Sequence, residues 1–277
     1  MPSAGQRLTI IEPPRGWIAL GLRELWRYRD LLSLLIWRDF SSRYRQSLIG
    51  IGWALIRPVI SMLVFTLVFG KMAKLPSDGA PYAIFNYAGL LPWLFFAGCL
   101  TTSSQSLVQG QALMTKVYFP RLILPLSKVA GGLIDFTIQF VLLLILMVFF
   151  RVTPSWRLAL IPGFLFLAIL TSLAVGILMT VINVKYRDVG QIIPFLSQAW
   201  MWLTPIVYSS SMVPERWRFL YGLNPLVGIV DGFRWAILDT TQPDWKMMMI
   251  SSSATVVLFV FSLLYFRRAE STLVDII

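Results

Sequence analysis

Histidine is absent from the 277-residue sequence, and Cys99 is its only cysteine. A disulfide within the chain is therefore excluded. Without histidine the chain cannot form a His-ligated metal site, use a histidine general base or build a Ser-His-Asp triad. No phosphate-binding loop of the form G-x-x-x-x-G-K-[ST] occurs, and no G-x-S-x-G or H-E-x-x-H motif. We therefore predict no catalytic residue, no metal site and no cofactor on this chain.

Charged side chains are also scarce. Only 13% of the residues are charged and 57% are apolar, a balance with too little polar surface for a water-soluble domain. Several apolar runs approach or exceed the roughly 18–20 residues that cross a bilayer as a helix. The short alternating segments of a transmembrane barrel are missing. The fold class predicted is an all-α membrane protein.

The net charge of +11 is the one feature that suggests nucleic acid. In a membrane protein, basic residues instead gather on cytoplasmic segments, where they set the topology and meet anionic lipid. We therefore predict membrane lipids as partners and no nucleic acid.

Two regions are predicted. Residues 1–47 form a cytoplasmic tail and an amphipathic interfacial helix, or two such helices, because apolar and arginine positions alternate from residue 17 onward. Residues 48–277 form a membrane domain of six transmembrane helices. The predicted spans are residues 52–69, 84–107, 127–150, 158–184, 191–208 and 247–266.

Lysine and arginine are about twice as frequent on one side of these spans as on the other. The positive-inside rule then predicts a multi-pass protein with both termini in the cytoplasm. Between the fifth and sixth spans, residues 213–238 are aromatic-rich but interrupted by proline and glycine. Short re-entrant or outer helices fit this segment better than another span.

Polar groups inside the predicted spans are few. Asp135 lies about two turns into the third span, and Lys128 is seven residues before it, too far for a direct pair. Asp135 either lines a cavity, bonds a neighbouring helix or is solvated near the cytoplasmic interface. Aromatic side chains are more frequent in the spans, and their faces stack on sugar rings. A pore lined by them offers the weak, repeated contacts that conduction of a polymer needs. The predicted pore aromatics are Trp93, Phe95, Phe96, Phe136, Phe140, Trp200 and Trp202.

Several motifs, taken in order, resemble one family over about residues 30–266. They are Trp37-Arg38-Asp39-Phe40, Arg43-Tyr44-Arg45, Leu48-Ile49-Gly50-Ile51-Gly52-Trp53-Ala54, Tyr87-Ala88-Gly89-Leu90-Leu91-Pro92-Trp93, Lys116-Val117-Tyr118-Phe119-Pro120-Arg121, Lys185-Tyr186-Arg187-Asp188-Val189 and Asn224-Pro225. Together they resemble the permease subunit of ABC-2-type polysaccharide exporters, the group that carries O-antigen, capsule or teichoic acid.

The resemblance implies a bacterial inner-membrane homodimer with two copies of a separate ABC ATPase, which holds ATP and Mg. It also implies a pore between the two copies and a glycan on polyprenyl pyrophosphate as the substrate. On this basis we expect contact with the lipid pyrophosphate, with the ATPase and at an outer gate. The three sets are Arg38, Arg43, Arg45, Gly50 and Gly52 for the lipid; Lys116, Tyr118, Arg121, Lys185, Arg187 and Asp188 for the ATPase; and Asn224, Asp231 and Arg234 for the gate.

Within these sets, residues 111–119 are expected to form a short coupling helix stopped by Pro120. Asp231 and Arg234 are three apart on one helical face and could pair.

Two alternative functions from other classes of membrane protein stay open. An integral membrane enzyme of envelope lipid synthesis would need acids or histidines clustered at one membrane face. An ion-coupled secondary transporter would need an internal repeat and mid-membrane charges. Within the exporter reading, O-antigen is favoured over capsule or teichoic acid by the second span and the first cytoplasmic loop.

Overall fold

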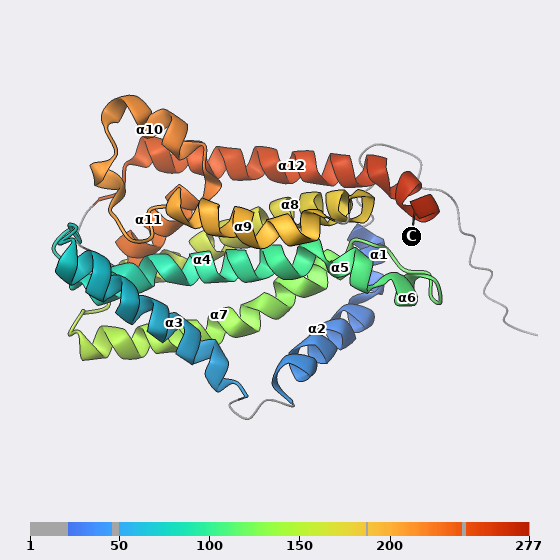
Figure 1. Ribbon diagram of the computed structural model, residues 1–277, viewed down its shortest axis with the longest axis horizontal. Coiled ribbons are helices and arrows are strands. Elements are labelled where there is room, and N and C mark those ends of the chain that lie inside the picture. Colours follow the sequence, from blue (N-terminus) through green and yellow to red (C-terminus); the bar gives the residue numbers. More distant parts are fainter. Residues whose placement is uncertain (1–21, 46–49, 187, 240–241, 277) are drawn as a thin grey trace, which may run out of the picture.

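The computed structural model describes residues 22–45, 50–186, 188–239 and 242–276, and Figure 1 shows them as a bundle of roughly aligned helices. Within these residues five helices are long and apolar enough to cross a membrane. They are α3 with its π-helical extension η1 (Gly52–Met72), α4 (Tyr82–Ser104), α7 (Ile123–Phe149), the 3₁₀ turn η2 with α8 (Trp156–Lys185), and α12 (Trp245–Ile276), of which Trp245–Glu270 is the candidate span.

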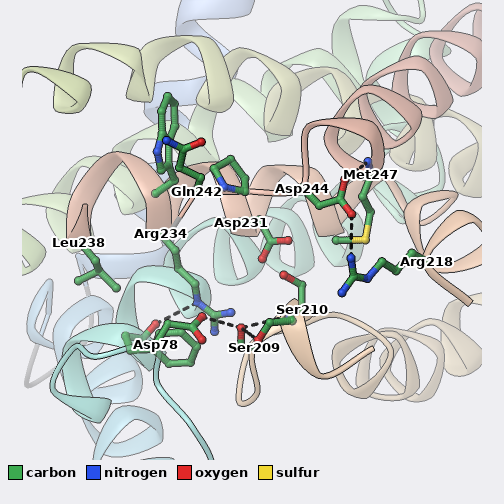
Figure 2. A pocket seen from close by; sticks show the side chains of 14 residues that line it. Asp78, Ser209, Ser210, Arg218, Asp231, Arg234, Leu238, Gln242, Asp244 and Met247 are labelled. Carbon is green, nitrogen blue, oxygen red and sulfur yellow. Dashed lines mark hydrogen bonds and ion pairs between the residues drawn. The ribbon is translucent and has the colours of Figure 1, made fainter. Parts of the chain in front are cut away.

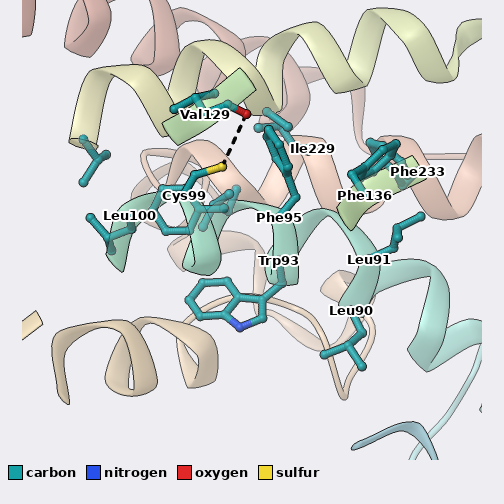
Figure 3. Close-up of a cluster of buried hydrophobic side chains, with 14 of the residues drawn as sticks. Leu90, Leu91, Trp93, Phe95, Cys99, Leu100, Val129, Phe136, Ile229 and Phe233 are labelled. Atoms are coloured by element: carbon teal, nitrogen blue, oxygen red, sulfur yellow. Dashed lines mark hydrogen bonds between the residues drawn. The ribbon is translucent and has the colours of Figure 1, made fainter. Parts of the chain in front are cut away.

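Helix α4 lies at the centre of the bundle, against α3, α7, α8, α9 and α11. It is apolar on all sides, as a helix surrounded by other helices must be. Its Tyr87 and Phe96 are fully buried. Figure 3 shows how Phe95 and Cys99 of α4 face the neighbouring helices, and the Phe136 ring of α7 meets the Phe233 ring of α11 at 6.1 Å. By contrast, α3, α7 and α12 leave much of their apolar surface exposed, as lipid-facing helices do.

The fifth predicted span, residues 191–208, does not appear as one continuous helix. Helix α9 (Val189–Trp202) has 14 residues and is therefore about 21 Å long, shorter than the roughly 30 Å hydrocarbon core. The chain then runs irregularly through Pro205, whose ring and missing N–H oppose a helix and whose predecessor, Thr204, is disfavoured in helical geometry.

Two short helices precede α3. They are α1 (Leu22–Arg27) and α2 (Arg29–Tyr44), and α2 packs against α7. The inward side of α2 buries Leu35, whereas Leu34 and Trp37 are exposed. The predicted amphipathic character of residues 17–47 stays a prediction. Residues 1–21 of the predicted tail lie outside the described residues.

One end of the bundle carries α5 (Ser106–Gln109) and α6 (Gln111–Met114), next to the last turns of α12 (Figure 1). The predicted helix over residues 111–119 was wrong in extent, because α6 ends at Met114. Two features oppose its continuation: Thr115 and Val117 are β-branched, and Phe119 precedes a proline. We call this the α6 end.

The opposite end, which we call the α10 end, carries the 3₁₀ turn η3 (Ser210–Met212), α10 (Glu215–Gly222) and α11 (Pro225–Leu238). Helices of 8 and 14 residues therefore occupy the segment 213–238, for which short helices were predicted. Helix α11 packs against α4, α8 and α12 and is almost wholly buried.

Candidate functional site

A cavity of about 640 Å³ lies between the end of α2, the start of α3, and the α6-side halves of α4 and α7. Its wall combines basic, aromatic and polar groups. The side chains that matter below are Arg43, Arg57, Lys128, Asp135, Phe95 and Phe136.

Asp135 fixes one wall of this cavity. Its carboxylate accepts a 2.7 Å hydrogen bond from Nη1 of Arg43 and a 2.6 Å hydrogen bond from the Tyr44 hydroxyl. Burial, and then the hydrogen bond to Asp135, raise the pKa of Tyr44 to about 12, so this phenol remains a donor at neutral pH. Of the alternatives left open for Asp135, the structure therefore supports two together, since it lines a cavity and bonds a neighbouring helix.

A second contact joins the same two helices. Nζ of Lys128 on α7 lies 2.5 Å from Oδ2 of Asp39 on α2, and both side chains are 13% exposed. Lys128 and Asp135 were expected not to pair with each other, and each instead pairs with a residue of α2. The two contacts hold α2 along α7 and thereby shape the cavity.

The five residues predicted for the lipid pyrophosphate fall into two groups. Arg43 and Gly50 line the cavity. Arg38, Arg45 and Gly52 are not part of its lining, and the Arg38 side chain is 57% exposed, 3.5 Å from Asp39.

Arg57 is a lining residue that the prediction missed. Its guanidinium lies over the Trp53 ring, 5.7 Å from the ring centroid, in a cation–π contact. The signal was present in the sequence, because Arg57 is the one arginine inside the first apolar run. Among the described residues Arg57 takes part in no ion pair within 4 Å.

Most of the predicted pore aromatics pack inside the chain. Trp93, Phe95, Phe96 and Phe136 are buried. Only Phe95 and Phe136 line the cavity. The remaining three, Phe140, Trp200 and Trp202, are at least partly exposed.

Contacts among these rings join several helices. Phe136 stacks on Phe140 at 6.0 Å, and Phe96 meets Trp200 of α9 edge-on at 5.1 Å. Trp202 is 45% exposed and contacts Phe65 and Phe69 of the first span.

The residues predicted to contact an ATPase gather at the α6 end. Lys116, Tyr118, Lys185 and Asp188 are exposed there, and Arg187 lies outside the described residues. Arg121 is instead a structural link, since its Nη1 donates a 3.0 Å hydrogen bond to the backbone oxygen of Glu270 on α12. The loop 115–122 is thus tied to the end of the last helix.

Asn224, predicted for the outer gate, connects α9 with α11. Its Oδ1 caps α11 by accepting from the Leu226 N–H at 3.1 Å, and it also accepts from Nε1 of Trp200 at 3.0 Å. Its Nδ2 donates to the backbone oxygen of Leu203 and the hydroxyl of Thr204. One amide therefore satisfies the polar groups that the irregular end of α9 exposes.

Arg234 clamps the same irregular segment from the other side. Its guanidinium donates to three backbone oxygens, those of Ile206 at 2.6 Å, Tyr208 at 3.1 Å and Phe85 at 3.3 Å. It also lies 3.7 Å from the centroid of the Phe85 ring. Gly89 allows this approach, because a Cβ there would lie 2.9 Å from the guanidinium.

Asp231 and Arg234 do not form the pair that their spacing allowed, since no ion pair within 4 Å joins these two described residues. The long arginine side chain reaches the carbonyls of other segments instead. Burial of Asp231 raises its pKa to about 6, against the lowering effect of Arg234. Both side chains line a second cavity of about 370 Å³ at the α10 end (Figure 2).

Among the described residues, no cluster of three or more acidic or cysteine side chains could hold a metal ion. The chemistry that both cavities offer is recognition by hydrogen bonds, charge and aromatic contact.

Comparison with known proteins identifies a family and several relatives that are similar to this chain. The family model described as ABC-2 type transporter matches residues 30–238. An "O-antigen export system permease protein RfbA" from Myxococcus xanthus is 30% identical over 239 residues, which cover 86% of this chain and 91% of that protein. A protein of the same name from Klebsiella pneumoniae is 25% identical, with 90% and 95% covered. The "Polysialic acid transport protein KpsM" of Escherichia coli is 23% identical, with 87% and 95% covered.

Proposed function

This chain belongs to the ABC-2 type transporter family, and we propose that it is the membrane subunit of an ATP-driven exporter of O-antigen. The proposed substrate is a polysaccharide linked to polyprenyl pyrophosphate. It would cross the inner membrane through a pore between two copies of the chain. Two of the relatives are named for O-antigen export and one for polysialic acid transport, so a capsular polysaccharide is the second candidate substrate.

The observation that carries the substrate proposal is the cavity between α2, α3, α4 and α7. It brings Arg43, Arg57 and Lys128 to one site beside apolar and aromatic walls. A lipid pyrophosphate has the same two parts, a polyanionic head and an apolar tail. Arginine suits the head because its guanidinium can donate two parallel hydrogen bonds to a phosphate.

Within this cavity we assign the first contact with the head group to Arg57. Arg43 and Lys128 are already paired with Asp135 and Asp39, which lowers their attraction for a further anion. Arg38, Arg45 and Gly52 lie near the same end of α2 and α3 and would meet the lipid before it reaches the cavity. Gly50 has a φ of +54°, a backbone conformation that glycine adopts without strain.

The α6 end is proposed to face the cytoplasm, with both termini on that side. The excess of lysine and arginine in the segments at this end supports the orientation. Two copies of a separate ATPase, which would hold ATP and Mg, are proposed to dock on Lys116, Tyr118, Lys185 and Asp188. Hydrolysis would move these loops, and the Arg121 link would pass the motion to α12.

The homodimer is proposed to form along α3 and α9. Both helices expose apolar side chains, among them Leu63 of α3, Leu67 of its extension η1, and Phe195 and Trp202 of α9. Helix α9 is too short to span a bilayer by itself, and irregular backbone at membrane depth is tolerated where protein or water covers it. A pore bordered by α9 would supply that cover, and the fifth predicted span would then be α9 continued by residues 203–208.

The test is co-purification of this chain with the ATPase encoded beside it. We expect a complex of two permeases and two ATPases that hydrolyses ATP and restores surface O-antigen to a strain lacking the permease. The matched control carries an ATPase whose phosphate-binding lysine is replaced, which should assemble without exporting. A folded permease that binds no ATPase would reject the exporter proposal, and restored capsule without O-antigen would select the second substrate.

A further inference from the structure

We propose that the 370 Å³ cavity at the α10 end is a binding site for a single sugar unit of the exported glycan. The proposal rests on the proposed function, since it takes its ligand from the polymer that the chain is proposed to carry. The volume of this cavity is at the low end of the range for small-molecule sites, about 300–1,000 Å³, and therefore fits one small polar molecule.

The lining comes from five separate parts of the chain. Asp78 lies in the loop between η1 and α4, Ser209 to Ser211 lie at η3, Arg218 on α10, Asp231 on α11 and Gln242 before α12. Figure 2 shows the Asp231 carboxylate in the middle, with Ser210 below it. Asp78 and Ser209 lie on one side and Asp244 with Arg218 on the other. Convergence of polar groups from distant segments is the arrangement of a recognition site.

The chemistry of the lining favours hydroxyl groups. Carboxylates accept hydrogen bonds from hydroxyls, whereas serine, glutamine and guanidinium groups donate to their oxygens or accept from them. Phosphate is disfavoured, because three carboxylates face the cavity and Arg234 is committed to three backbone oxygens. A divalent cation is disfavoured by the two guanidinium groups in the lining, and no described cluster has the ligands to hold a metal.

Unused hydrogen-bonding capacity points the same way. Nε1–H of Trp235, a lining residue, is buried and has no partner within the described part of the chain. Buried polar groups are ordinarily paired, so this donor is an exception, and it belongs to a residue that lines the cavity. Asp231 is itself 91% buried, given its 9% exposed fraction.

Position gives the site its role. The α10 end is where the polymer would leave the pore if the α6 end faces the ATPase. A sugar bound there in each protomer would retain the emerging polysaccharide between successive cycles of ATP hydrolysis. Binding of one unit at a time is weak enough to release the polymer as the next unit arrives.

The experiment uses the fact that the native cysteine does not interfere. Cys99 is 1% exposed, so a polar maleimide reacts only with a cysteine introduced elsewhere. Ser210→Cys and Gln242→Cys each place one thiol at the cavity, from two different segments. Thr153→Cys is the matched control, an exposed position at the same end that does not line the cavity.

Each variant, purified with its ATPase, is labelled with and without lipid-free oligosaccharides cut from the source bacterium's surface polysaccharide. Glycerol at equal hydroxyl concentration is the control solute. At ligand about tenfold above its dissociation constant, labelling of Ser210→Cys and Gln242→Cys should slow about tenfold, and that of Thr153→Cys should not change. Adding Asp231→Asn should abolish this protection.

Equal labelling rates with and without oligosaccharide at both cavity positions would overturn the inference, as would equal slowing by glycerol. This failure is distinct from failure of the exporter proposal. A complex that exports glycan but shows no protection rejects the sugar site alone, whereas a chain that binds no ATPase rejects the exporter.

Discussion

The Arg43 guanidinium and the Asp135 carboxylate are 92 positions apart in the sequence and 2.7 Å apart in the structure. The same carboxylate accepts the Tyr44 hydroxyl, so the last turn of α2 is fixed to the cavity wall by two contacts. Helix α2, which we predict to lie at the membrane surface, is thereby coupled to the proposed lipid site. Movement of either would change the other.

Replacing Asp135 should loosen α2 without unfolding the bundle. Asp135→Ala leaves Arg43 and Tyr44 without their acceptor, at a cost of about 1–2 kcal/mol, because Arg43 is partly exposed and water screens the pair. Thermal unfolding in detergent, with limited proteolysis after residue 45, measures this. Asp30→Ala is the control, since the Asp30 side chain is 95% exposed and its loss should change neither readout. Equal effects of the two would refute the link.

Arg57 is predicted to matter more for lipid binding than Arg45, although both are exposed arginines near the same helix ends. Arg57→Gln should weaken activation of the ATPase by polyprenyl pyrophosphate at least tenfold, since a charge-assisted contact contributes about 1.5–3 kcal/mol. Arg45→Gln should weaken it by less than half as much on a free-energy scale. The measurement is the lipid concentration that gives half-maximal ATPase activity in the reconstituted complex. If both variants shifted it equally, the cavity would not be the head-group site.

The sequence predicted what depends on local composition. Five spans follow from uninterrupted apolar runs, and the short helices of residues 213–238 follow from their prolines and glycines. It failed where a side chain chooses among distant partners. Spacing alone suggested that Arg234 could pair with Asp231, but its guanidinium donates instead to backbone oxygens of the irregular segment after α9. No local pattern reveals that those oxygens lie within its reach. Asp135 was recognisable as a polar group in a span, yet its partners on α2 could not be read from spacing.

Arg234 is predicted to be the most sensitive of the gate residues to replacement. Arg234→Ala would leave three backbone oxygens without their donor in a buried site, at a cost of about 3–5 kcal/mol. The thermal midpoint and the yield of folded protein should both fall, and Arg234→Lys should recover only part of the loss because an ammonium lacks the planar fork. Arg216→Ala, on the exposed side of α10, is the control. If Arg234→Ala left the thermal midpoint and the yield unchanged, the hydrogen bonds of Arg234 would not stabilise the segment after α9.

Orientation can be tested with the same single-cysteine approach. If the α6 end faces the cytoplasm, Lys116→Cys should react with a membrane-impermeant maleimide only in inside-out vesicles. Thr153→Cys, beyond the other end of α7, should react only in right-side-out cells. Cys99 is buried and supplies no background in the parent protein. The reverse pattern would show that the α6 end faces away from the cytoplasm, and the proposed ATPase contacts would then be refuted.

Asp231 should make stability depend on pH in a direction opposite to that of most carboxylates. Burial raises its pKa in the folded protein to about 6, against the opposing influence of Arg234 and Ser210, while Asp78 and Asp244 raise it further. The folded state therefore binds the proton more tightly than the unfolded state, for which the pKa is near 3.8. Stability should be highest below about pH 4 as far as this group is concerned, and should fall as the pH rises through 6. Asp231→Asn removes the cost of the buried charge, so it should flatten this dependence and stabilise the protein at pH 7 by up to about 3 kcal/mol.

The same replacement is expected to abolish sugar protection of the cavity, so it separates stability from binding. Thermal midpoints of the parent and Asp231→Asn, measured from pH 4.5 to 8, test the first part, and the labelling assay tests the second. If Asp231 serves packing alone, Asp231→Asn should leave the protection of the cavity cysteines by oligosaccharide unchanged. If Asp231 is retained for ligand binding, Asp231→Asn should abolish protection by the sugar and also stabilise the folded protein. Stability should rise because the buried charge of Asp231 destabilises the folded state.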